Sequence, residues 1–150
     1  MAIVLKESWT GWVDIIKGEL SFFIENATID QGEKLELIRL EMLLLDEKLP
    51  EAKTENERLE ITKAMPANKQ AQLLTLLQKL YRQTIKYQVK DWKGVQDSSG
   101  KDIEISLSNN EIEDKQFAKL IKCILSLNIL AHTYQCISKE TMLTEADKKK

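Results

Sequence analysis

Glycine and proline are scarce in this chain, which has five glycines and two prolines among its 150 residues. These two residue types interrupt helices and strands more strongly than any others, so their scarcity favours long helices. Hydrophobic residues make up 43% of the sequence, enough to bury a core without disulfides or metals. We therefore expect an α+β fold that is mostly α-helical, in which helices pack with a small β-hairpin or short antiparallel sheet.

The length is typical of one domain, and no internal repeat or low-complexity linker divides the chain. We expect a single globular domain over residues 1–143. Residues 144–150 are mostly polar and end in lysines, so we expect a disordered tail there.

Residues 1–26 show the weakest helical pattern. Leu20, Phe22 and Ile24 recur at every second position, which is typical of a strand. Gly11 and Gly18 bound a preceding piece that is either strand or a short turn of helix. Together these patterns predict an N-terminal hairpin.

A helix is predicted to begin near Thr28–Gln31, whose sequence has the form of a capping box. Apolar residues then recur at helical spacing as far as Pro50, which should end the helix. Leu37, Leu40 and Leu44 widen the apolar stripe beyond what one contact face requires. These leucines indicate burial on two sides, either within the core or against a partner chain.

Residues 51–63 are highly charged and predict an exposed loop or a solvated helical turn. A second long helix is expected over about residues 67–84, with Pro66 near its first position. Alternating aliphatic residues then flank a turn-forming segment, which predicts a β-hairpin over about residues 89–105. Its expected structural residues are Trp92, Gly94, Asp97 and Gly100, with the tryptophan packed under the turn.

Ser108–Glu111 has the form of a second capping box and predicts another helix start. The helical pattern continues to Ile137, and Asn128 is expected to mark a break or kink.

The charge balance argues against a nucleic-acid-binding protein, because 22 basic and 24 acidic residues are mixed along the chain. No apolar run approaches the roughly 18 residues of a membrane-spanning helix, and no secretory signal is recognisable. We expect a protein without a membrane partner in the cytoplasm, which would be the host cytoplasm if a phage encodes it. Cys123 and Cys136 are then expected to be buried free thiols.

Catalytic chemistry has little support in the sequence. His132 is the single histidine, and no strained serine turn accompanies it. Cys123, Cys136 and His132 supply three potential zinc ligands, fewer than the four that a structural site needs, and lack Cys-x-x-Cys spacing. We predict no catalytic, cofactor-binding or metal-binding residue, and a protein that is not an enzyme. Trp9 and Trp12 are instead candidate anchors for a partner protein, together with Leu37, Leu40 and Leu44.

The segment from Val89 to Lys101 resembles a stretch found in small tail-assembly chaperone-like proteins of tailed bacteriophages. The similarity lies in a valine, then Trp92, then Gly94 followed by an aliphatic residue, and a turn from Asp97 to Gly100. A short strand at residues 103–105 and the polar helix start at residues 108–111 follow. The strand at residues 20–24 and the capping box at residues 28–31 resemble the opening of that family. The match extends over about residues 18–130, with a long helical insertion at about residues 35–84.

This resemblance implies a non-enzymatic role, in which the protein covers apolar helices of the tape-measure protein or binds another tail protein. Self-association along such a client would be expected, because one small subunit covers little of a long chain. An alternative is a small phage or bacterial inhibitor that binds and blocks a host enzyme or a defence complex. Such inhibitors also have mixed charge and no catalytic motif.

Overall fold

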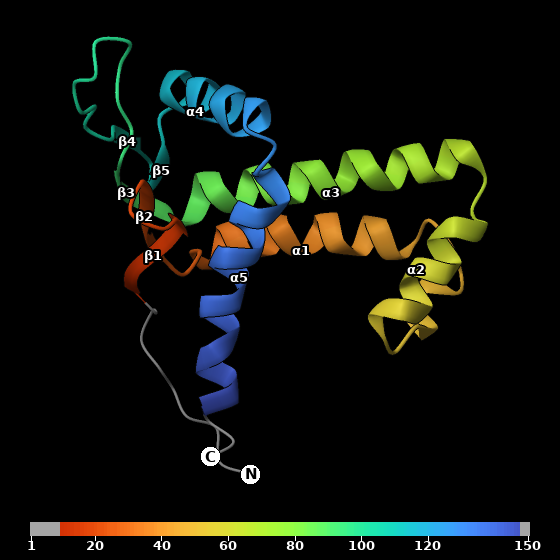
Figure 1. Ribbon diagram of the computed structural model, residues 1–150. Coiled ribbons are helices and arrows are strands. Elements are labelled where there is room, and N and C mark those ends of the chain that lie inside the picture. Colours follow the sequence, from red (N-terminus) through yellow and green to blue (C-terminus); the bar gives the residue numbers. More distant parts are fainter. Residues whose placement is uncertain (1–9, 148–150) are drawn as a thin grey trace. The chain divides into compact units, whose positions relative to one another are not determined.

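The structure is a computed structural model that describes residues 10–147, with side chains described for residues 10–139. Its elements are, in order, β1 (Thr10–Ile16), β2 (Leu20–Glu25), α1 (Ile29–Leu43), η1 (Leu49–Glu51), α2 (Glu55–Ala64), α3 (Ala67–Gln88), β3 (Val89–Lys93), β4 (Leu107–Ser108), β5 (Glu111–Ile112), α4 (Asp114–Ser126) and α5 (Leu130–Asp147) (Figure 1). The expected α+β class with mostly helical content is confirmed.

Two compact units make up the chain. Unit 1 combines residues 1–28 with residues 84–150, and unit 2 is the intervening segment, Ile29–Gln83. Unit 2 nearly coincides with the helical insertion expected at residues 35–84, whereas the single domain over residues 1–143 stays a prediction. Helix α5 runs to Asp147, so residues 144–147 are helical where a disordered tail was expected.

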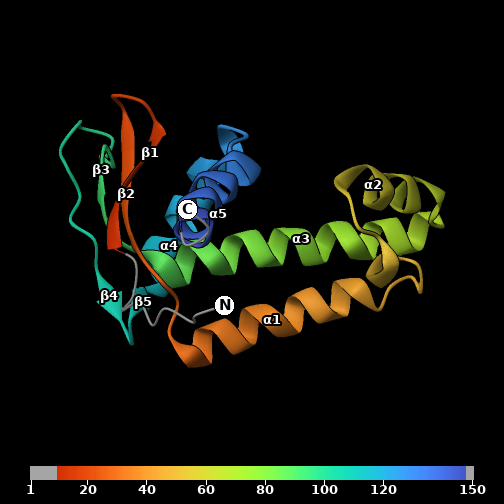
Figure 2. The same ribbon diagram turned by 90° about the horizontal axis from the view of Figure 1, so that it is seen from below.

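Unit 1 contains a three-stranded antiparallel sheet with the strand order β1-β2-β3 (Figure 2). Gly18, with a φ of 77°, lies in the turn between β1 and β2, and the predicted N-terminal hairpin is confirmed. One face of the sheet is buried, because the alternating side chains of β1 and β2 point inward at Val13, Ile15, Phe22 and Ile24.

The hairpin predicted over residues 89–105 is wrong in its second strand. β3 pairs with β2, and Phe22 lies opposite Trp92 in that register. Residues 95–103 still form a turn, with a bridge between Gln96 and Asp102, but residues 103–105 are not a strand. The tertiary fold places β3 beside the edge of β2, a strand that is far away in the sequence. A local sequence pattern cannot show that β2, and not residues 103–105, pairs with β3.

Ser108–Glu111 is a hairpin turn and not the predicted helix start. Asn109 and Asn110 have φ angles of 54° and 62°. Two consecutive residues at positive φ are what a tight type I′ connection between β4 and β5 requires, and asparagine tolerates this conformation well. Helix α4 begins later, at Asp114.

The predicted break at Asn128 is confirmed, and its cause is a Schellman motif at the end of α4. Asn128 has a φ of 55°. Its N–H donates to the Leu125 carbonyl, and the Ile129 N–H donates to the Ile124 carbonyl at 3.1 Å. These bonds satisfy carbonyls that the helix end would leave open, and α4 and α5 meet at 108°.

Unit 2 is a small helical unit with its own apolar cluster. Leu49, Met65 and Leu73 form the buried centre, and Met42, Leu45, Ile61 and Leu77 pack against it. Helix α1 ends at Leu43, earlier than predicted, and Pro50 lies in the short turn η1. The charged segment after it contains the helix α2, which has no buried residue; its N-cap Thr54 accepts from the Glu57 N–H.

Candidate protein-binding surfaces

Three leucines on α1 and its last turn are exposed, and we call them the leucine stripe. The exposed fractions are 60% for Leu37, 48% for Leu40 and 83% for Leu44. Their spacing places them on one side of the helix. The Leu44 N–H donates to the Leu40 carbonyl, which continues the helical turn beyond Leu43. The sequence pattern left open whether these leucines are core or interface, and the structure places them at the surface.

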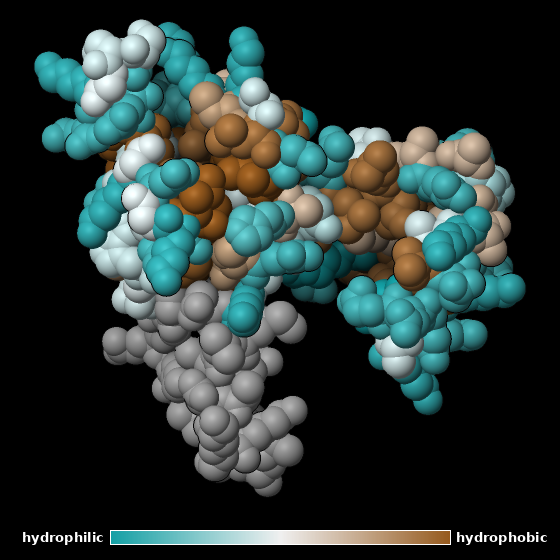
Figure 3. All heavy atoms as spheres, in the orientation of Figure 1, coloured by the Kyte–Doolittle hydropathy of each residue, from teal (hydrophilic) through white to brown (hydrophobic). Residues whose placement is uncertain are grey.

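The leucine stripe borders an open groove within unit 2. Leu44 and Leu45 line one side of this groove, and Leu76, Ala71 and Thr75 of α3 line the other. Figure 3 shows hydrophobic side chains gathered along α1 and α3 in this unit.

Acidic side chains accompany the leucine stripe. Glu33 and Glu41, one helical turn before and after Leu37, are both exposed. α1 as a whole carries four acidic residues, Asp30, Glu33, Glu36 and Glu41, against Lys34 and Arg39. The stripe is therefore an apolar surface bordered by charges of both signs, with acidic side chains in excess.

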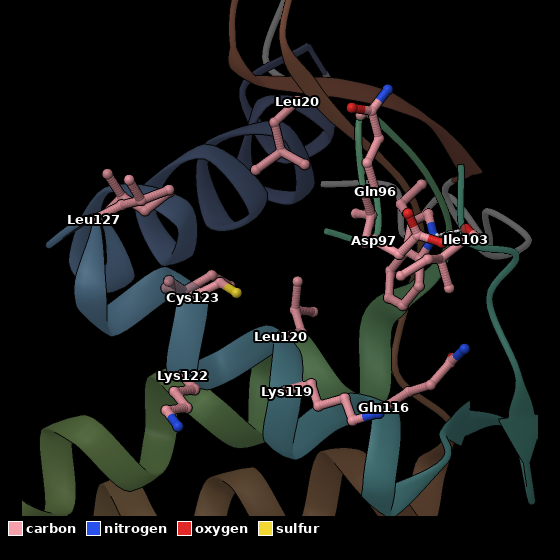
Figure 4. A pocket seen from close by; sticks show the side chains of 15 residues that line it. Leu20, Gln96, Asp97, Ile103, Gln116, Lys119, Leu120, Lys122, Cys123 and Leu127 are labelled. Carbon is pink, nitrogen blue, oxygen red and sulfur yellow. Dashed lines mark hydrogen bonds between the residues drawn. The ribbon is translucent and has the colours of Figure 1, made fainter. Parts of the chain in front are cut away.

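Unit 1 contains a pocket of about 570 Å³ between α4 and the ends of β2 and β3. Figure 4 shows Leu20 of β2 facing Leu120 and Cys123 of α4 across this space. The apolar part of the lining consists of Leu20, Trp92, Val95, Ile103, Leu120, Ile124, Leu127 and Ile129. A volume of this size is typical of sites that hold apolar ligands or side chains.

Three specific contacts fix the wall of this pocket. The Trp92 Nε1–H donates to the Ile103 carbonyl at 2.7 Å, which ties the loop after β3 to the sheet. Gln116 of α4 accepts from the Ser106 N–H and donates to the Glu104 carbonyl at 2.8 Å. These contacts hold the pocket wall from the β3 side and from the α4 side. The Trp92 side chain is buried, with an exposed fraction of 7%, as its predicted packing under the turn requires.

Gly94 is needed where β3 passes the turn between β1 and β2. Its φ is 90°, and a Cβ atom at this position would lie 1.7 Å from the carbonyl oxygen of Glu19. Glycine alone allows this close approach, which brings Leu20 and the end of β3 to the same pocket.

The charged lining residues of the pocket are two lysines and one aspartate. Lys119 and Lys122 are exposed, and Figure 4 shows Lys122 directed away from the apolar middle. The Asp97 carboxylate accepts from the Ser99 hydroxyl and from the N–H groups of Ser99 and Lys101. These bonds, the hydroxyl first, lower the pKa of Asp97. The carboxylate therefore stays ionised, so the lining carries one negative charge on the Asp97 turn and two positive charges on α4.

Trp12 is the one predicted aromatic anchor that the structure describes, and Trp9 lies outside the described residues. The Trp12 side chain is 43% exposed on the outer face of the sheet. Its ring contacts Phe23 edge-on, with 5.4 Å between centroids, and the Lys93 ammonium lies 4.3 Å from its centre. Trp12 is thus accessible but already packed on two neighbours within unit 1.

A cluster around Lys86 joins the end of α3 to the start of α4 within unit 1. The Lys86 ammonium lies 2.5 Å from an Asp114 oxygen and 3.9 Å from a Glu111 oxygen. It also lies 5.5 Å from the centre of the Phe117 ring. The hydrogen bond to Asp114, followed by the charge of Glu111, raises the pKa of Lys86 against the opposing effect of burial.

The two cysteines are free thiols, as predicted, but Cys123 is exposed and Cys136 is half-buried. His132 Nε2 lies 2.9 Å from the Ile15 carbonyl oxygen and 3.5 Å from the Cys136 sulfur. Cys123 lines the pocket instead of joining them. Among the described residues, no group of three or more His, Cys, Asp or Glu side chains is arranged to hold a metal ion.

The sequence interpretation missed the pocket, because its walls come from segments that are far apart in the chain. The one local signal was the run of apolar residues at the end of α4 and just after it, at Leu125, Leu127 and Ile129, which exceeds what a single helix contact requires.

No single helix in the described part of the chain is long and apolar enough to cross a membrane. Comparison with protein-family models, with curated proteins and with solved structures gives no match to this chain.

Proposed function

We propose that this protein is a non-enzymatic protein-binding module that acts as a phage tail-assembly chaperone. It covers apolar helices of the tape-measure protein before the tail tube encloses them. The proposal is supported by the leucine stripe, whose side chains are 60%, 48% and 83% exposed at Leu37, Leu40 and Leu44. Contiguous exposed leucines on a folded subunit are typical of a surface that another polypeptide covers.

An apolar client helix is the partner that this surface fits. Leu37, Leu40 and Leu44 follow the spacing by which one helix packs along another. The adjoining groove at Ala71 and Thr75 accepts side chains from such a helix. Several copies would line up along a long client, since each one offers a single short stripe.

The test is co-expression of the protein with the tape-measure protein of the same phage, or with the longest helical protein encoded beside it. We expect a soluble complex with the wild type. The Leu37→Glu, Leu44→Glu double variant should leave most of the client insoluble, because the charges prevent apolar contact.

Leu74→Glu is the matched control, since Leu74 is 58% exposed on α3 but does not line the groove. The chaperone proposal would be contradicted if Leu74→Glu left as much of the client insoluble as the double variant does. It would also be contradicted if the client were equally soluble without the wild-type protein. Purification of a host enzyme or defence complex in its place would favour the inhibitor alternative.

A further inference from the structure

The pocket of unit 1 has an apolar interior. The buried side chains of Trp92, Leu120 and Ile124 form its inner part, and Leu20 of β2 faces α4 across it (Figure 4). Leu127, which is 61% exposed, lies at its rim. The volume of about 570 Å³ is within the range of sites that hold small organic molecules.

Hydrogen bonds and one close backbone approach fix the walls of this pocket. The Ile103 N–H donates to the Val95 carbonyl at 2.9 Å, and the Trp92 Nε1–H donates to the Ile103 carbonyl at 2.7 Å. Gly94 lets the end of β3 lie against the Glu19 backbone. A site with fixed walls binds at a lower entropic cost, because the ligand does not have to order them.

The neutral polar side chains that line the pocket already make hydrogen bonds within the protein. Gln116 uses both ends of its amide, on the Ser106 N–H and on the Glu104 carbonyl. Gln96 donates to the Asp102 carboxylate at 3.2 Å. A ligand that carries several polar groups would lose its hydrogen bonds to water and find few new partners here. The pocket therefore favours an apolar ligand.

The charged side chains of the lining have both signs and belong to different walls. Asp97 lies in the loop after β3 and is ionised, whereas Lys119 and Lys122 lie on α4 and are exposed. An anionic ligand would be attracted by the lysines and repelled by Asp97, and a cationic ligand would experience the reverse. The lining therefore gives neither sign a strong advantage.

From these observations we infer that the pocket is a binding site for a small, neutral, largely hydrocarbon molecule. A closed cavity of about 150 Å³ can hold one benzene ring, so this larger and more open space accommodates roughly two or three fused rings or an alkyl chain of similar bulk. Burial of the apolar surface of the ligand supplies the affinity. The site does not use the leucine stripe, so the inference goes beyond the chaperone proposal.

The first experiment titrates the full chain with N-phenyl-1-naphthylamine, a neutral apolar dye whose emission rises in an apolar site. We expect saturable binding to the wild type. Cys123→Phe should weaken the affinity about tenfold or more, because Cys123 faces the pocket and the added ring fills part of it (Figure 4).

Two controls show where the dye binds. Leu125→Phe adds the same ring to an exposed position of α4 that does not line the pocket, and the Leu37→Glu, Leu44→Glu variant removes the leucine stripe. Both controls should bind the dye as the wild type does. All of the substituted side chains are exposed, and circular dichroism checks that each variant folds.

The two thiols report occupancy of the pocket in the wild type itself. Both are free, and Cys123 lines the pocket whereas Cys136 does not. Saturating 1-naphthalenemethanol should slow the alkylation of Cys123 by iodoacetamide about fivefold or more, because the bound molecule blocks access to its sulfur. The rate at Cys136 should not change. Mass spectrometry measures both rates.

Three probes with the same ring and different charge test the class of ligand. They are 1-naphthalenemethanol, which is neutral, 1-naphthoate, which is anionic, and 1-naphthylmethylammonium, which is cationic. We expect the neutral probe to displace the dye at about one tenth of the concentration that either charged probe needs, because a charged group loses hydration at an apolar site. Equal or tighter binding of a charged probe would overturn the assignment of a neutral ligand.

Other outcomes would overturn the site itself. They are dye binding that does not saturate, equal weakening by Cys123→Phe and Leu125→Phe, loss of dye binding in the leucine-stripe variant, and equal protection of both thiols. No client is present in these measurements, so the solubility test of the chaperone proposal remains independent of them.

Discussion

Individual residues in unit 1 hold positions that their immediate contacts explain. Gly94 occupies a backbone conformation and a space that exclude any side chain, whereas Gly100 has a similar φ of 82° in open surroundings. Trp92 combines burial with a hydrogen bond to Ile103. These residues were expected to be structural in a local hairpin, and the structure gives them that role between more distant segments.

Gly94→Ala should lower the free energy of unfolding by about 3 kcal/mol or more, since it adds steric overlap to an unfavourable φ. Gly100→Ala carries the φ penalty alone and should cost about 1 kcal/mol. Gly32→Ala, within α1 and without near neighbours, should stabilise the protein by about 0.5–1 kcal/mol. Urea denaturation of the three variants checks this order, and similar costs for Gly94 and Gly100 would contradict the close approach to Glu19.

Trp92→Ala should destabilise the protein by about 3–5 kcal/mol because it removes a large buried side chain. Trp92→Phe keeps most of the apolar contact but leaves the Ile103 carbonyl without its donor, so we expect a loss of about 1–3 kcal/mol. Thermal unfolding measures both changes. An unchanged melting temperature for the alanine variant would show that the ring is not part of the core.

Helix ends and the contacts between elements follow chemistry that is partly visible in the sequence. The break at Asn128 was recognised because asparagine readily adopts positive φ after a helix. Ser108–Glu111 was misassigned because serine, asparagine and glutamate favour both helix starts and tight turns. The positive φ of Asn109 and Asn110 decides between the two, and the pairing of β4 with β5 imposes it.

Asn128→Ala should destabilise the junction of α4 and α5 by about 1 kcal/mol, because alanine in the left-handed region has a Cβ clash without a compensating polar side chain. Asn128→Gly should preserve or slightly raise stability, since glycine is the preferred residue at this position. Chemical denaturation of both variants distinguishes backbone conformation from side-chain contacts. A lower stability of the glycine variant would indicate that the Asn128 side chain itself matters.

The contact between α3 and α4 at Lys86 should make stability depend on alkaline pH. The Lys86 pKa is raised above its ordinary value of 10.5, so the folded protein holds this proton more tightly than the unfolded chain. The resulting stabilisation is complete below 10.5 and is lost as pH rises through the folded-state pKa.

Asp114→Asn should remove most of this effect. We expect a loss of about 0.5–1 kcal/mol at neutral pH, because Asp114 is largely exposed and solvent screens the pair. Urea denaturation at about pH 8 and about pH 11 should show a smaller alkaline decrease in the variant than in the wild type. Equal decreases in the two proteins would assign the alkaline sensitivity to other groups.

The distribution of leucines between core and surface belongs to the whole molecule. Leu73 is buried in the cluster of unit 2, whereas Leu44 is 83% exposed, although both belong to strongly apolar helical segments. Sequence periodicity could place both residues on helices. It could not say which face another element covers.

Leu73→Ala should therefore lower the free energy of unfolding by about 2–5 kcal/mol, and Leu44→Ala by less than about 0.5 kcal/mol. Differential scanning calorimetry of both variants provides the comparison. A large loss of stability for Leu44→Ala would make the leucine stripe part of the fold and would remove the basis for its role in binding.

The sequence by itself determined the mostly helical content, the N-terminal hairpin, the break at Asn128 and the mixed surface charge. These features depend on the properties of neighbouring residues, which a sequence displays directly. Only the tertiary structure decided that β3 joins β2, that Gly94 meets Glu19, and that α4 closes a pocket against Leu20. Each of these depends on segments far apart in the chain, whose contact is set by competition among many possible partners and leaves no local periodicity.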